Sequence, residues 1–177
     1  MWRIFLAMVL GVVMAANAAE PQLTSGMTMP ELKGEFLTGE KAVMPAATKG
    51  KIAFFALGFS YESRYPVEDW TSEFRKHYGS NPATVFYEVP MIGGFGRLGR
   101  WFIDSGMRRA TPRDLHRNVM TVYGGTGPWR ERLSVRDDKA ACLILIDRSG
   151  VVRWIHSGMF DEGAFAGLKS AVDQLLE

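Results

Sequence analysis

Two short runs of consecutive apolar residues constrain the fold of this chain more than any other feature of its sequence. Residues 51–57 read KIAFFAL, and residues 142–146 read CLILI. Runs of this length without polar alternation are typical of strands that are covered on both faces, as in a parallel or mixed sheet. The sequence therefore predicts an α/β domain built around two buried strands.

Periodic patterns predict several of the other elements. Apolar residues spaced by three or four positions predict a helix over 63–78 and a closing helix over 165–175. The segments 83–89 and 151–156 are rich in β-branched and aromatic residues and are expected to be strands. A tight turn at 147–150 should join the last two strands into a hairpin.

The middle of the chain is expected to be helical. Residues 97–122 should form two helices broken at Pro112, because proline is not tolerated inside a helix. Residues 124–127 are expected to be a loop, and a short hairpin is expected within 31–44. The element order predicts a central mixed β-sheet flanked by α-helices, with an inserted helical segment before the C-terminal hairpin.

The first 18 residues are predicted to be a signal peptide. Arg3 is followed by an apolar stretch over 4–15 and by the small residues of a cleavage site at 16–18. The stretch is shorter than the roughly 20 residues of a spanning helix, and an uncleaved membrane anchor is the alternative. The chain is therefore expected to be exported to the periplasm, with an irregular lead-in over 19–49 and one domain over 50–177.

Composition narrows the classes of function. Cys142 is the only cysteine, so no internal disulfide can form, and its place in an apolar run predicts a buried, inert thiol. The formal net charge of +2 and the hydrophobic content of 47% describe a globular domain and do not indicate a nucleic-acid partner.

The first buried strand leads into the sequence Phe-Ser-Tyr-Glu-Ser-Arg at residues 59–64. Here the chain resembles thioredoxin-like proteins, in which this strand ends in a W-C-x-x-C motif at a helix N-terminus. Ser60 and Ser63 stand at the two cysteine positions, and Ala141 stands at the position of the family's cis-proline. The resemblance implies a single thioredoxin-like domain without thiol–disulfide exchange, because a serine hydroxyl stays protonated. The two serines are interpreted as N-cap residues of the following helix.

Three other patterns are weaker. Residues 58–62 are similar to the G-x-S-x-G elbow of hydrolases but lack its second glycine. Residues 94–99 match G-x-G-x-x-G, with Asp114 about 20 residues beyond, but the strand that should carry this acid is not expected, so a flexible loop without a cofactor is favoured. No metal site is predicted, because the histidines lack ligand spacing. They are His77, His116 and His156.

Arginine dominates the segment 97–132, which has eight arginines and only three acidic residues. Arginine without lysine favours bidentate contact with carboxylate or phosphate. The segment is predicted to bind an acidic protein partner or an anionic lipid surface, and the alternative is a solvated face whose arginines pair within the protein. The predicted surface consists of Arg97, Arg100, Trp101, Arg108, Arg109, Arg113 and Arg117.

Residues 50–177 are also similar to the mitochondrial ATP synthase assembly-factor family. The matching features are Trp70, the segment 107–109 with Pro112 and His116, the run 143–147, the segment 152–154 and Gly158. This resemblance implies a non-catalytic assembly or chaperone protein that binds a protein client or membrane complex. The alternatives are a thiol-dependent peroxidase or other oxidoreductase using Cys142, and an enzyme with a serine nucleophile at Ser60.

Overall fold

The computed structural model describes residues 21–94 and 97–177. The predicted signal peptide, residues 1–18, lies outside the described residues. No helix in the described part of the chain is long and apolar enough to cross a membrane.

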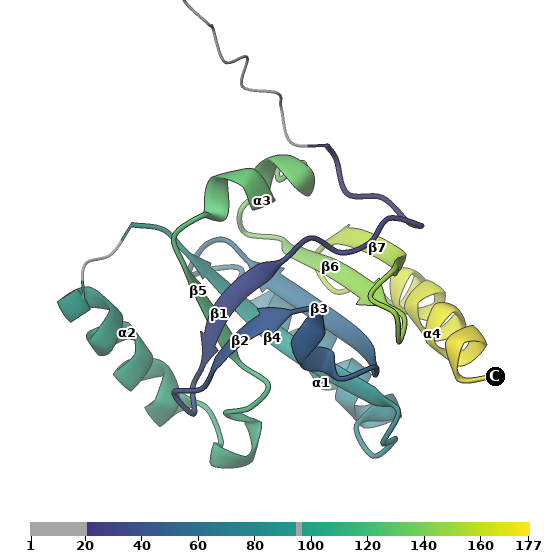
Figure 1. Cartoon of the computed structure of the whole chain (residues 1–177), viewed down its shortest axis with the longest axis horizontal. Coiled ribbons are helices and arrows are strands. Elements are labelled where there is room, and N and C mark those ends of the chain that lie inside the picture. The colour runs from purple at the N-terminus through teal and green to yellow at the C-terminus, as the bar shows by residue number, and fades with distance from the viewer. Residues whose placement is uncertain (1–20, 95–96) are drawn as a thin grey trace, which may run out of the picture.

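One seven-stranded mixed sheet forms the centre of the domain, in the order β2-β1-β5-β4-β3-β6-β7 (Figure 1). The central strands β3, β4 and β5 are parallel, and all other neighbours are antiparallel. The strands are β1 (Leu32–Phe36), β2 (Lys41–Met44), β3 (Ile52–Gly58), β4 (Thr84–Ile92), β5 (Met120–Tyr123), β6 (Ala141–Ile146) and β7 (Val152–Gly158).

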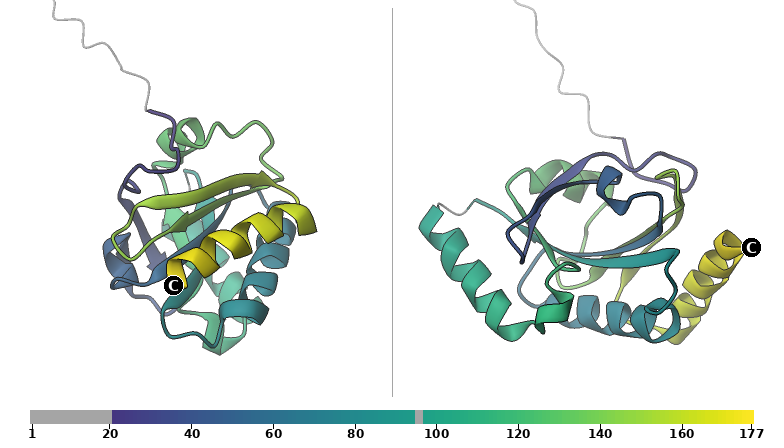
Figure 2. Two further views of the ribbon diagram at one scale, coloured as in Figure 1. Left: turned by 90° about the vertical axis from the view of Figure 1, so that its right-hand side faces the viewer. Right: turned by 60° about the horizontal axis from the view of Figure 1, so that its bottom comes forward.

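The two apolar runs form β3 and β6, which are neighbours in the sheet, and every residue in both strands is buried. Helices α1 (Arg64–Tyr78) and α4 (Glu162–Leu176) cover one face (Figure 2), where Phe54, Trp70 and Phe165 share a core. The N-terminal segments and α3 (Thr126–Arg132) supply the core of the other face. Both faces of the central strands are therefore dry, as the unbroken apolar runs predict.

The lead-in contributes to the same sheet. The hairpin expected within 31–44 is present as β1 and β2, and β1 pairs with β5. The segment 19–49 is thus less irregular than its many turn residues indicate, because two of its strands extend the sheet.

The prediction of two helices over 97–122 is wrong in its second half. Helix α2 (Arg97–Ala110) ends before Pro112, and only a short 3₁₀ helix, η2 (Arg113–Leu115), follows. Residues 120–123 form β5, which bridges β1 and β4 because both of its neighbours offer unpaired edges. The expected loop at 124–127 also runs into helix α3, whose Pro128 lies in the first turn, where proline is tolerated.

The hairpin between β6 and β7 is held by the carboxylate of Asp147. Its Oδ1 accepts hydrogen bonds from the amides of Ser149 (2.9 Å) and Val151 (3.0 Å) and from the Ser149 hydroxyl (2.7 Å). Its Oδ2 accepts a hydrogen bond from Arg153 Nε at 2.7 Å. Gly150 adopts φ 84°, a left-handed conformation that favours glycine. The predicted turn at 147–150 is therefore confirmed, with an aspartate as its organising residue.

Candidate functional site

The carboxyl ends of the parallel strands meet at one edge of the sheet, where α/β proteins commonly bind ligands. At the end of β3, Gly58 pairs with Pro90 of β4 on one side and with Ala141 of β6 on the other. Ala141 in turn pairs with Gly158 at the end of β7. This edge therefore brings together the loop 59–63, the start of β6 and the end of β7.

Ser60 and Ser63 hydrogen-bond to each other reciprocally. Ser60 Oγ accepts from the Ser63 amide at 3.1 Å, and Ser63 Oγ accepts from the Ser60 amide at 3.2 Å. The Ser63 hydroxyl also donates to the Ser60 carbonyl at 2.8 Å. This is the arrangement of a capping box, in which two side chains satisfy the amides at the start of a helix.

The interpretation of both serines as N-caps of α1 needs a correction. Ser63 directly precedes α1, but its side chain caps none of the helix amides and points back to Ser60 instead. Ser63 already has helical backbone angles, φ −64° and ψ −13°, so Ser60 caps a turn that leads into the helix. Gly58 makes room for this contact, since a Cβ there would lie 2.5 Å from Ser63 Oγ.

Three exposed side chains beside the serine pair form a cluster that the sequence analysis missed. Tyr61 is 71% exposed and Tyr65 is 55% exposed. The guanidinium of Arg64 lies 3.8 Å from the centre of the Tyr61 ring and 4.5 Å from that of the Tyr65 ring. We call Tyr61, Arg64 and Tyr65 the aromatic cluster. Its signal in the sequence is two tyrosines and an arginine within five residues after a buried strand.

Cys142 lies inside the sheet, on the face opposite α1. It pairs with Leu57 and Ser157, is 1% exposed, and its Sγ lies 3.6 Å from Ser157 Oγ. Burial raises the pKa of the Cys142 thiol, and the weaker effects of Ser157 and Arg130 oppose that rise. Reactive cysteines have lowered pKa values and are accessible. This environment stabilises the neutral thiol.

Over the stretches of chain that it describes, the structure does not bring together the residues that a serine nucleophile at Ser60 or a metal site would need. Among the described residues, no histidine is hydrogen-bonded to Ser60. The His116 ring is 3.0 Å from the Thr111 carbonyl, and the His77 and His156 rings lie against Phe165 and Trp70 respectively. No three potential metal ligands come together in the described part of the chain.

The glycine motif at 94–99 spans the junction of β4 and α2, and residues 95–96 lie outside the described residues. Asp114 lies in η2 and not at the end of a strand, where a ribose-binding acid would be.

The predicted arginine surface divides into residues with different environments. Arg108 Nε donates to the Leu37 carbonyl at 2.7 Å, and Arg100 lies 4.8 Å from the centre of the Tyr123 ring. Arg109, Arg113 and Arg117 are exposed, as is Trp101. The Arg97 side chain lies outside the described residues.

The last two arginines of the segment belong to α3 and not to this surface. Arg130 donates to the Phe59 carbonyl at 3.2 Å, which places it beside the strand edge, and Arg132 lies near Trp129.

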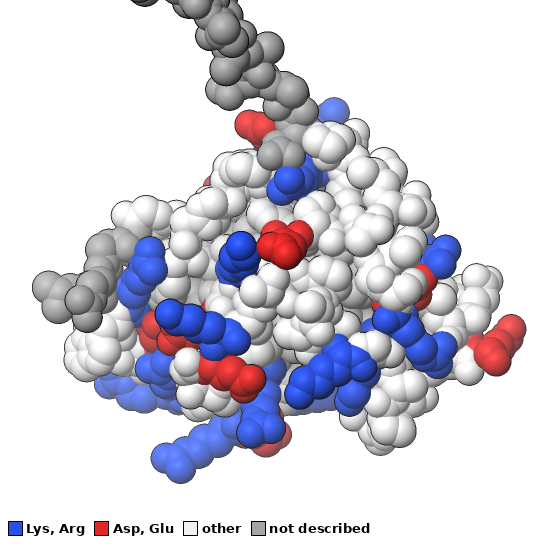
Figure 3. All heavy atoms as spheres, viewed as in Figure 1, with Lys and Arg blue, Asp and Glu red and all other residues white. Residues whose placement is uncertain are grey.

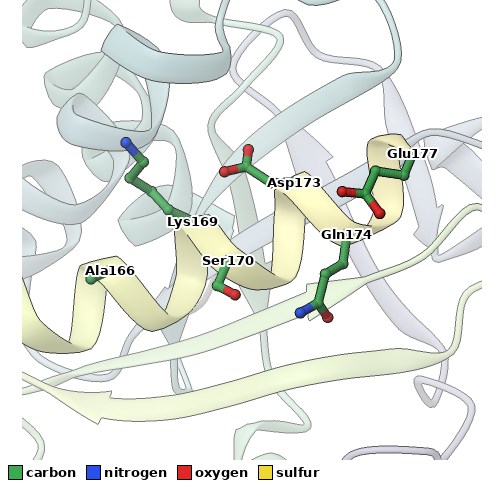
Figure 4. A pocket seen from close by; sticks show the side chains of 6 residues that line it. All are labelled: Ala166, Lys169, Ser170, Asp173, Gln174 and Glu177. Carbon is green, nitrogen blue, oxygen red and sulfur yellow. The ribbon is translucent and has the colours of Figure 1, made fainter.

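An open hollow of about 520 Å³ lies along the outer side of α4. Figure 4 shows that Lys169 and Asp173 point to one side of this helix and that Ser170 and Gln174 point to the other. Asp173 accepts a hydrogen bond from Tyr78, at the end of α1 that is remote from Ser63. These side chains do not converge on a common point, so the hollow is not the candidate site.

One partly buried carboxylate was also missed. Glu88 of β4 accepts a hydrogen bond from Thr71 of α1 at 2.8 Å. Burial raises the pKa of Glu88, and the hydrogen bond from Thr71 opposes that rise. Glu88 pairs with Ala56 of β3, two residue pairs inside the sheet from the Gly58–Pro90 pair at the loop edge.

No protein-family model and no curated protein matches this chain. Solved structures do match its fold. The exposed lipoprotein thioredoxin of Streptococcus pneumoniae has a TM-score of 0.56 and 17% identity over 81% of this chain and 99% of that chain. BsSco, of the Sco family of cytochrome c oxidase assembly proteins, has a TM-score of 0.56 and 10% identity over 85% of this chain and 96% of its own. The thiol peroxidase of Chromobacterium violaceum has a TM-score of 0.54 and 13% identity over 86% of this chain and 89% of that chain.

Proteins with three different activities thus share this architecture, and identities of this size carry the fold alone. The topology and these similarities establish a thioredoxin-like α/β fold, in which the described residues form a mixed seven-stranded sheet and four α-helices.

Proposed function

We propose that this protein is a redox-inactive thioredoxin-like binding protein of the assembly or chaperone type. The observation that carries the proposal is the reciprocal bonding of Ser60 and Ser63 at the start of α1. A dithiol works at such a place because the helix N-terminus stabilises a thiolate. Two hydroxyls that bond each other's backbone amides offer no group that exchanges with a disulfide.

Thiol chemistry at Cys142 is the second candidate, because the fold is shared with thiol–disulfide oxidoreductases and a thiol peroxidase. The buried position of Cys142 and its raised pKa oppose this candidate. A peroxidatic or exchanging thiol must meet its substrate as a thiolate.

The aromatic cluster supports a binding role. Tyrosine and arginine are enriched at the energetic centres of protein interfaces. The cluster lies on the edge where the sheet's parallel strands end, which suits a protein client better than a small molecule, because its side chains stand exposed. BsSco is an example of an assembly protein with this fold. The predicted leader favours export from the cytoplasm, and the pneumococcal thioredoxin of the same fold is described as an exposed lipoprotein. A membrane complex such as ATP synthase is the client that the sequence resemblance favours.

Two measurements test the proposal. Purified protein should neither reduce insulin nor consume peroxide. A photo-cross-linking amino acid at Tyr61 or Tyr65, expressed in the native host, should give discrete adducts, whereas the same probe at exposed Gln174 on α4 should not. Turnover that disappears in Cys142→Ser, or equal adducts at all three positions, would contradict the proposed function.

If the serines occupy dithiol positions, cysteines there should form a disulfide. Each serine's Oγ lies within 3.2 Å of the other's backbone amide, so the side chains of the S60C/S63C variant face each other. We expect the two added thiols of this variant, purified in air and counted after unfolding, to be detected only when the protein has first been reduced. Each single variant should keep its added thiol free, and persistent thiols in the double variant would show that the geometry differs.

Cys142 should not react with a thiol reagent in the folded protein. Because the side chain is 1% exposed and burial raises its pKa, Ellman's reagent should label it only after unfolding. The labelling rate at increasing urea should follow the unfolding transition. Rapid labelling in native buffer would mean that the thiol is accessible to substrates.

A further inference from the structure

Helix α2 carries two large apolar side chains on the side that faces away from the domain. Trp101 is 67% exposed and Phe102 is 71% exposed, whereas Ile103 and Met107 are partly buried. Exposed aromatic residues on adjacent positions are costly in water unless something covers them. The outer face of α2 therefore has the composition of a contact surface.

The helix is fixed to the domain by its other side. Asp104 accepts a hydrogen bond from Tyr123 of β5 at 2.7 Å, and Arg108 donates to the carbonyl of Leu37 after β1. Figures 1 and 2 show α2 at one flank of the domain, on the side opposite α4. These contacts set the direction in which Trp101 and Phe102 project, and they leave the outer face open.

Positive charge surrounds the two aromatic residues. Residues 99–117 contain five arginines and two aspartates, an excess of three positive charges, while the whole chain has a formal net charge of +2. Figure 3 shows basic side chains gathered over the region where Figure 1 draws α2 and the segment after it, with a few acidic ones among them. The basic character of the protein is therefore local to this flank.

We propose that the outer face of α2 binds the surface of an anionic lipid bilayer. Helices that lie in a membrane interface combine aromatic or leucine side chains on one face with basic residues around them. Tryptophan favours the headgroup layer, because its ring is apolar and its N–H is polar. Trp101 and Phe102 insert at that depth, and Arg109, Arg113 and Arg117 contact lipid phosphates.

This inference goes beyond the proposed function, since Trp101 and Phe102 of α2 belong neither to the serine pair nor to the aromatic cluster at the strand edge. Membrane binding through α2 places that edge at a fixed orientation above the bilayer. The lipid experiment tests only the role of α2, and the redox and cross-linking experiments test only the proposed function. Either proposal can therefore fail while the other stands.

The test is flotation of the exported, purified protein with phosphatidylcholine vesicles, with and without phosphatidylglycerol. Binding should require the anionic lipid and should weaken at high salt, because screening shortens the reach of surface charges. The partition coefficient of the variant R109E/R113E/R117E should fall by at least about tenfold, given the contribution of each basic residue near an anionic surface. Arg136→Glu makes the same type of charge change at an exposed site outside α2 and should leave binding unchanged.

The aromatic contribution is tested separately. W101S/F102S should lower the partition coefficient by about tenfold or more, since burying each ring removes a large apolar area from water, whereas Trp101→Phe should retain most of the binding. The wild-type tryptophan emission should shift to shorter wavelength on anionic vesicles, and W101S/F102S should lose the shift. All proteins carry the same N-terminus, so its contribution cancels. Equal binding to neutral vesicles, unchanged binding by both multiple variants, or an α2-dependent protein partner without vesicle binding would overturn the proposal.

Discussion

The variant Trp70→Ala is expected to lose about 3–5 kcal/mol of unfolding free energy, the usual cost of truncating a large buried aromatic residue. Trp70 is fully buried between α1 and the sheet. Its ring centre lies 5.2 Å from that of Phe160, 5.7 Å from that of His156 and 6.1 Å from that of Phe165. Alanine would leave a cavity that these rings, which lie on β7, on α4 and on the segment between them, cannot close.

Urea denaturation with a two-state fit measures this loss, and two variants serve as controls. Trp70→Phe should cost less, because the Nε1 of Trp70 has no hydrogen-bond partner among residues 21–94 and 97–177, so that phenylalanine removes no bond seen there. Trp101→Ala makes the same chemical change at an exposed position and should stay within about 0.5 kcal/mol of the wild type. If Trp70→Ala and Trp101→Ala lower the free energy of unfolding equally, Trp70 is not central to the core between the sheet and helices α1 and α4.

Asp147→Ala should destabilise the domain by about 2–4 kcal/mol, because hydrogen bonds to a charged group are strong and the amides of Ser149 and Val151, whose hydrogen bonds to it are partly buried, would lose their acceptor. The side chain organises the β6–β7 hairpin through Ser149, Val151 and Arg153. At the other end of the hairpin, away from this turn, Gly158 and the start of β6 form part of the candidate site. Thermal unfolding should show a lower midpoint, while far-ultraviolet circular dichroism at low temperature keeps the native shape.

The same carboxylate predicts a dependence of stability on pH. Burial tends to raise the pKa of Asp147, but the Ser149 hydroxyl, the Val151 and Ser149 amides and Arg153 together lower it from 3.8 to about 2. A lowered pKa means that the folded state holds the charged form more tightly than the unfolded state does. The resulting stability, of order 1–2 kcal/mol, is present above the unfolded pKa and is lost as the pH falls toward 2.

Asp147→Asn should therefore flatten the acid limb of the stability curve, whereas Asn at the exposed Asp114 should leave it unchanged. If the free energy of unfolding falls equally at low pH in both variants, other carboxylates cause the pH dependence.

The buried elements of the fold could be predicted from the sequence because their signal is local. An unbroken apolar run such as 52–57 is compatible with a strand covered on both faces, and the spacing of Val67, Trp70 and Phe74 defines one side of a helix. The positions of Ser60, Ser63 and Ala141 relative to the strand ends also follow from chain order. Ala141 lies beside them because β6 runs antiparallel to β3, so that the start of β6 pairs with the end of β3.

The elements that were missed depend on contacts made after the chain folds. The strand β5 is four residues long, and its pairing with β1 and β4 defines it as a strand. Helix α3 follows two glycines and contains another glycine and a proline, so local propensity opposes it, but the burial of Trp129 stabilises it. Likewise, the direction of the Ser63 side chain follows from the space that Gly58 leaves, which no local pattern reveals.

The reciprocal serine bonds also bear on how the strand edge would respond to its surroundings. A cysteine pair at a helix start has two chemical states, and the shape and charge of the surface around it change with the reduction potential of the compartment. Hydroxyls bonded to amides have one state over the whole range of biological potentials. A client that binds beside Tyr61 and Tyr65 would therefore meet the same surface under oxidising and reducing conditions, and its capture and release would have to be timed by something other than electron transfer.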